Sequence, residues 1–105
     1  MRERDIEKHL VARVKALGGE VRKVQWIGRR GAPDRLVMLP PRWARVSAPV
    51  GMPTTAHRGG AIWVELKAPG EDPTTQQLRE HERMRVMCQC VVVINSIEGV
   101  DALLT

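Results

Sequence analysis

The chain has 105 residues, 43% of them hydrophobic, and its 17 lysines and arginines outnumber its 12 acidic residues. This length suits one compact domain, and the hydrophobic content excludes a disordered or low-complexity chain. The net charge of +5 and the pI near 10.0 favour a polyanionic partner such as nucleic acid.

The sequence shows no sign of export or membrane insertion. No apolar run approaches the roughly 18 residues that cross a bilayer, and the first residues form no apolar signal segment. Cys88 and Cys90 are too close for an unstrained disulfide, and with three scattered histidines they match no zinc pattern. We therefore expect reduced, mostly buried thiols in a cytoplasmic protein that does not enter a membrane.

Hydrophobic periodicity predicts the order helix, strand, strand, strand, helix, strand, helix within a single domain, residues 1–105. The helices are expected at 4–17, at 73–87 and from 95 onward, and the strands at 20–27, 35–39, 61–67 and 91–94. The stretch from about 40 to 60 is rich in proline and glycine and is expected to be a long loop. The last strand has no polar alternation, which predicts burial on both faces.

The two main predicted helices carry different signals. At about 100° per residue, Glu3 and Glu7 fall inside the apolar arc of the first helix, where a carboxylate needs a partner. The second helix could begin with Asp72 and Pro73, or with a capping box formed by Thr74 and Gln77. Its apolar side is expected to consist of Leu78, Met84 and Met87.

Three polar residues lie on or beside the predicted strands. Asp34 stands directly before one strand, and Glu65 and Lys67 share a face of another because they are two positions apart. A solvent-facing pair and a turn cap are the simpler readings of each residue alone. Together the two carboxylates can coordinate a hard divalent cation, and the lysine can position an attacking water. These are the groups that metal-assisted phosphodiester hydrolysis requires.

The positive charge is concentrated before residue 60, and residues 88–105 contain no lysine or arginine. A solvated basic face is the alternative to a phosphate-binding surface. Trp26 could stack on a base or pack in the core, and His81 is expected at the surface or half-buried. The candidate DNA-binding residues are Lys23, Arg29, Arg30, Arg35, Arg42, Arg45 and Arg58.

These residues resemble a known family. The pair Pro33-Asp34 followed by Glu65-Leu66-Lys67 is similar to the PD-(D/E)XK nuclease signature. The segments GAPDRLV at 31–37, VELKAPG at 64–70 and QLREHERM at 77–84 resemble the VRR-NUC (virus-type replication-repair nuclease) branch, in a stand-alone phage-type form. The resemblance implies a restriction-endonuclease-like α/β fold, αβββαβ(α), with a central mixed sheet flanked by helices.

The resemblance also implies roles for individual residues. Asp34 and Glu65 would ligate the metal together with the backbone carbonyl of Leu66, and Lys67 would be the catalytic lysine near the attacking water. Gln77 matches a glutamine that family members place next to the active site.

The first-helix acid of the family pattern would be a further catalytic and metal-binding residue. Glu7 is the favoured candidate because it lies inside the helix, and Glu3 competes with it.

The activity implied is a Mg²⁺- or Mn²⁺-dependent endodeoxyribonuclease for branched or Holliday-junction-like DNA in replication or repair. It would act as a homodimer in the cytoplasm of a bacterial or phage-infected cell, because one small chain could hardly span both strands of a junction. The alternative is a catalytically inactive DNA-binding module or accessory subunit of the same fold. The sequence departs from the pattern at about 40–60, where a Pro/Gly-rich insertion separates two core strands.

Overall fold

The computed structural model describes residues 1–40 and 60–105, so the expected insertion and Arg42, Arg45 and Arg58 lie outside the described residues. Within the described ranges the elements follow the expected order. They are α1 (Glu3–Ala16), β1 (Glu20–Lys23), β2 (Arg35–Leu39), β3 (Gly60–Leu66), α3 (Thr75–Val86), β4 (Val91–Ile94) and α4 (Ile97–Leu103).

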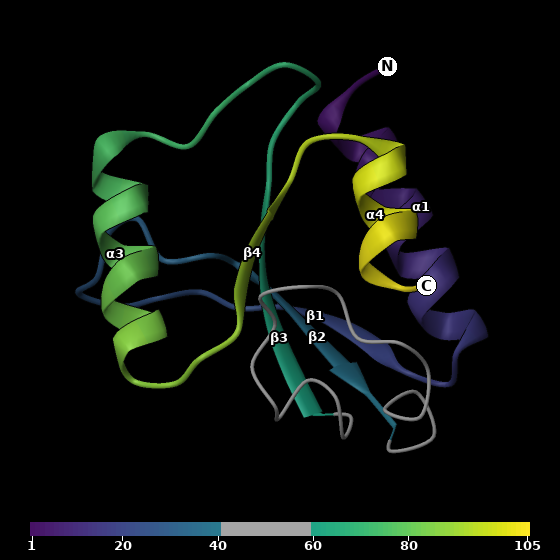
Figure 1. Ribbon diagram of the computed structural model, residues 1–105, viewed down its shortest axis with the longest axis horizontal. Helices are drawn as coiled ribbons and strands as arrows, with labels where there is room; N and C mark the ends of the chain where they lie inside the picture. The colour runs from purple at the N-terminus through teal and green to yellow at the C-terminus, as the bar shows by residue number, and fades with distance from the viewer. Residues whose placement is uncertain (41–59) are drawn as a thin grey trace.

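The strands form one mixed sheet in the order β1-β2-β3-β4. The first three strands pair antiparallel, and β3 pairs with β4 in parallel. Helices α1 and α4 lie side by side on one side of the sheet and α3 lies on the other (Figure 1). The α/β fold with a mixed sheet flanked by helices is therefore confirmed.

Alternation along the strands divides the side chains between two layers. One sheet face is covered by α1 and α4, and its core contains Ile6, Leu10, Val37, Ile62 and Val64, all fully buried. The opposite face, which carries Trp63 and Glu65, lies toward α3. None of the described helices is long and apolar enough to span a membrane.

The structure corrects the expected apolar side of α3. Leu78 and Met87 are 51% and 60% exposed, whereas the buried residues of this helix are Glu80, His81 and Met84. Positions 80, 81 and 84 are spaced as one helical stripe. The stripe was missed because two of its three members are polar, and only their partners on the sheet and the preceding loop make their burial tolerable.

Three smaller expectations also change. The first strand ends at Lys23 instead of continuing to Ile27, whose side chain is 95% exposed. Strand β4 is buried at its ends, but Val92 and Val93 are only half-buried because β4 is an edge strand. The thiols are reduced as expected, but Cys88 is exposed in the turn after α3 and only Cys90 is buried. Burial raises the pKa of Cys90 to about 11.

The loop before β2 approaches the start of α3 so closely that only glycine fits at position 31. Gly31 has φ +82°, and a Cβ there would lie 2.9 Å from the backbone oxygen of Gln76. Gly28 in the same loop has φ +72° but open space around the missing side chain. A side chain at position 31 would therefore cause both backbone strain and a steric clash, whereas one at position 28 would cause backbone strain alone.

We predict that Gly31→Ala lowers the free energy of unfolding by about 3 kcal/mol, because a left-handed backbone and a clash with α3 add together. Gly28→Ala carries only the backbone cost and should lose about 1 kcal/mol. Urea unfolding of both variants measures the difference. Equal losses would show that the loop does not contact α3.

Candidate active site

Asp34 and Glu65 come together because of the register between β2 and β3. Arg35 pairs with Val64 across these antiparallel strands. Continuing that register by one residue places Asp34 opposite Glu65 on the sheet face toward α3. The proximity is also electrostatic, since the Asp34 carboxylate contributes to raising the pKa of Glu65.

The loop before β2 fixes the backbone around Asp34. The Trp26 indole Nε1 donates to the carbonyl of Pro33 at 2.8 Å, and the amide of Val24 donates to the carbonyl of Asp34 at 2.9 Å. Trp26 also packs against Trp63, with ring centroids 5.2 Å apart. The half-exposed Trp26 thus holds the segment that presents Asp34, whose own side chain is 58% exposed.

Glu65 is a buried acid, only 7% exposed to solvent. Burial raises its pKa to about 7, while Lys67 opposes the shift and Asp34 adds to it. Its Oε1 lies 3.2 Å from Nε2 of His81, a fully buried histidine on α3. Burial also lowers the pKa of His81, with the positive charges of Arg85 and Lys67 acting in the same direction, so the imidazole is neutral.

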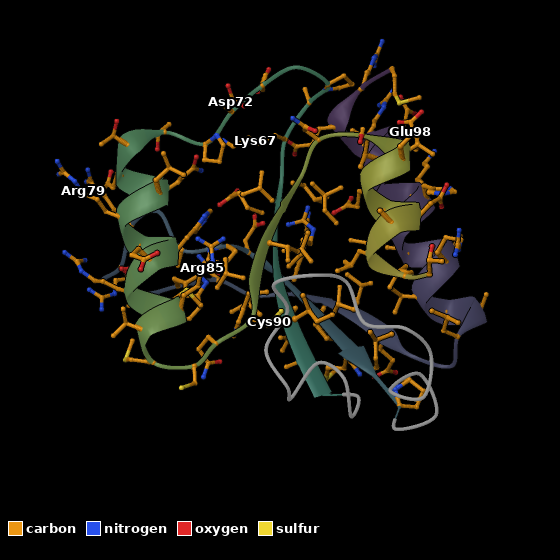
Figure 2. The ribbon with its side chains drawn as sticks, in the orientation of Figure 1. Lys67, Asp72, Arg79, Arg85, Cys90 and Glu98 are labelled. Carbon is orange, nitrogen blue, oxygen red and sulfur yellow. The ribbon has the colours of Figure 1, made fainter. Side chains whose placement is uncertain are left out.

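Lys67 follows the last residue of β3, on the same face as Glu65 by strand alternation. Its amide donates to the carbonyl of Ile94 at 2.9 Å, which continues the parallel pairing of β3 with β4. Figure 2 shows Lys67 where the chain leaves the sheet toward α3. The structure therefore gathers Asp34, Glu65 and Lys67 at one end of β2 and β3, with the backbone of Leu66 between the last two.

Glu7 is half-buried and faces Arg35 instead of the two strand acids. Arg35 donates from Nε and Nη2 to Oε2 of Glu7 and reaches Oδ1 of Asp34 from Nη1 at 2.8 Å. The Arg35 side chain is 9% exposed, so this residue, expected to contact DNA, is already engaged as a counter-ion inside the protein. Glu3 is exposed, and its charge adds a smaller upward contribution to the pKa of Glu65.

Gln77 is the third residue of α3 and forms a capping box with Thr74, the residue just before the helix. Its side-chain oxygen accepts from the amide of Thr74 at 2.8 Å, and its own amide donates to the Thr74 hydroxyl at 3.1 Å. The capping box, and not Asp72 with Pro73, therefore starts this helix. Gln77 also lies against Gly31, so its place near the Asp34 loop is fixed by packing.

A second buried acid, Glu80, was missed by sequence reasoning. It is 4% exposed and is held by Arg29 Nε at 2.9 Å and by Arg83 Nη1 at 3.3 Å. Arg29 thus ties the loop before β2 to α3, in addition to any role at the surface. Lys23 and Arg30 are exposed.

The donors fit a hard cation in their chemistry but do not form a complete cage. Across residues 1–40 and 60–105, no three or more His, Cys, Asp or Glu side chains are placed to hold a metal ion together. Two strand carboxylates and one backbone carbonyl remain, and Mg²⁺ is commonly held by one or two carboxylates with waters completing its shell. The raised pKa of Glu65 fits the same idea, because a cation would stabilise its charged form.

Comparison with known proteins identifies the family, although no family model matches the chain. The chain is 45% identical over 96 residues to "Putative nuclease p44" of Acyrthosiphon pisum secondary endosymbiont phage 1, covering 91% of this chain and 85% of that protein. A solved structure described as a "VRR_NUC domain" has a TM-score of 0.73 at 39% identity and covers 96% of this chain and 91% of its own. Similarity of this extent, joined to the fold and motifs above, shows that the chain belongs to the VRR-NUC family of nucleases.

Proposed function

We propose that this nuclease is a Mg²⁺- or Mn²⁺-dependent endodeoxyribonuclease. The observation that carries the proposal is that the strand register places Asp34 opposite Glu65. Lys67 follows Glu65 by two residues and lies on the same face. A buried acid beside a second acid is costly unless a cation is bound. No structural need of the sheet accounts for all three residues together.

The proposed roles follow from the donor types. Asp34, Glu65 and the carbonyl of Leu66 would hold the cation, which when bound polarises a phosphoryl oxygen and makes water a better nucleophile. Lys67 carries three N–H donors, with which it would orient the attacking water and offset negative charge near the phosphate. Glu7 remains a second candidate acid, which Arg35 would have to release.

The exposed basic loop is the proposed contact with the DNA backbone. Arg29, Arg30 and Arg83 share a polar hollow of about 610 Å³ with Trp26 and Gln76. Because Glu80 already neutralises part of this charge through Arg29 and Arg83, Arg30 is the proposed phosphate contact in this hollow. Lys23 pairs with Arg35 across β1 and β2, which places it on the sheet face toward α1 and away from this hollow. Binding of this kind recognises phosphates and shape and not base sequence.

We further propose that the substrate is branched DNA, including four-way junctions, and that the enzyme acts as a homodimer. A chain of 11.8 kDa carries one candidate site, whereas cutting both strands of a branch symmetrically needs two. Exposed apolar side chains near the end of α3, Val86 and Met87 at 74% and 60%, support self-association.

We predict that Lys67→Ala lowers the rate of cleavage of branched DNA in Mg²⁺ by about 100-fold or more, the usual loss when a group that stabilises transition-state charge is removed. The substrates are single-stranded, duplex, flap and four-way DNA, and binding is measured in parallel with Ca²⁺. Asp34→Asn should behave in the same way, with DNA affinity preserved in both variants.

Lys15→Ala is the matched control, because it removes the same charge from an exposed position on α1. It should cut like the wild type. Equal cleavage by Lys67→Ala and Lys15→Ala would contradict the proposed site. Binding of branched DNA without any cleavage by the wild type would instead favour an inactive DNA-binding module or accessory subunit.

We predict a particle of twice the 11.8 kDa chain mass in sedimentation equilibrium at micromolar concentration. Two copies bring two sites to one substrate, so a dimer is the smallest assembly that can cut a junction symmetrically. A monomer that stays at 11.8 kDa both alone and on four-way DNA would contradict the dimer.

A further inference from the structure

His81 is a fully buried polar side chain between α3 and the sheet. It is 0% exposed, and it faces Glu65, the buried acid of β3. Its Nε2 lies 3.2 Å from Oε1 of Glu65, and its Nδ1 has no hydrogen-bond partner within residues 1–40 and 60–105. A leucine or methionine would fill this position without leaving a buried nitrogen unsatisfied.

The tautomer of the ring follows from the charge state of Glu65. A neutral imidazole has one N–H and one acceptor nitrogen. A Glu65 carboxylate that is ionised because it binds a cation can only accept, so the proton then belongs on Nε2 and Nδ1 is the acceptor nitrogen. The arrangement gives Glu65 a directed hydrogen bond at the cost of one unsatisfied nitrogen.

We propose that His81 is a positioning residue that donates from Nε2 to Oε1 of Glu65 and thereby leaves Oε2 free for the divalent cation. This inference rests on the proposed function, because it assumes that Glu65 is a metal ligand. Hydrogen-bonded partners of ligating groups tune metal affinity by fixing the geometry of the ligand. Here the partner sits on α3, whereas the ligand sits on β3.

The position of α3 makes this donor a rigid one. The helix is tied to the Asp34 loop by the contact of Gly31 with Gln76, and to β4 by Arg85, which donates to the carbonyl of Val91 at 2.8 Å. These attachments lie on either side of His81 in the helix. The ring therefore has little freedom to move when Glu65 takes up a cation.

Two substitutions separate the donor from the volume of the ring. His81→Gln keeps an N–H donor at about the place of Nε2, whereas His81→Met has a similar bulk and no donor. Met84→Leu is the matched control, since it is a volume-conserving change at a position 6% exposed on the same helix. Mn²⁺ affinity is measured by calorimetry, and Tm is recorded in EDTA for every variant.

We expect the Kd for Mn²⁺ to rise about tenfold in His81→Met, and to stay within about threefold of wild type in His81→Gln and Met84→Leu. Equal Mn²⁺ affinity in His81→Met and wild type would overturn the inference and leave the proposed function intact. Absence of Mn²⁺ binding by the wild type would overturn both.

The tautomer provides a second measurement that needs no variant. Long-range ¹H–¹⁵N correlation spectra of the wild type in saturating Mg²⁺ should show the proton of His81 on Nε2. A proton on Nδ1 would overturn the inference, even if His81→Met failed to fold.

Discussion

The buried carboxylate of Glu65 is the constraint around which the rest of the site is arranged. The antiparallel register of β2 and β3 brings Asp34 opposite it, and the fully buried His81 covers it from α3. Burying a charge next to another acid is unfavourable without a compensating cation. Glu65 therefore lowers the stability of the fold, as residues at functional sites often do.

Side-chain contacts hold the loop before β2 against α3 on one side of the site and against α1 on the other. Trp26 holds the backbone of Pro33, Gly31 lets the same loop touch α3, and Glu80 receives Arg29 from the loop and Arg83 from its own helix. On the other sheet face, Arg35 joins Asp34 to α1 through Glu7. Asp34 is thus supported from both sides of the sheet, which links the core packing of α1 to the geometry of the candidate site.

Sequence patterns predicted the element order, the α/β class and the family, because apolar alternation and the segments around Asp34 and Glu65 are local signals. They failed where burial depends on a partner distant in sequence. Glu80 and His81 can be buried on α3 because Arg29 forms an ion pair with Glu80 and Glu65 forms a hydrogen bond with His81. Arg35 read as a surface cation, since nothing near it in sequence shows that Glu7 neutralises it. The metal site itself stays a prediction.

We propose that Glu65 destabilises the fold on its own and becomes favourable when a divalent cation is bound. The most direct measurement is the Tm of wild type and Glu65→Gln at pH 8, with EDTA and with Mn²⁺. Because the pKa of Glu65 is raised to about 7, folding loses stability as pH rises through that value, and Glu65→Gln should melt higher in EDTA. Mn²⁺ should raise the Tm of the wild type above that of the variant. An equal rise in the Tm of both proteins with Mn²⁺ would contradict metal binding by Glu65.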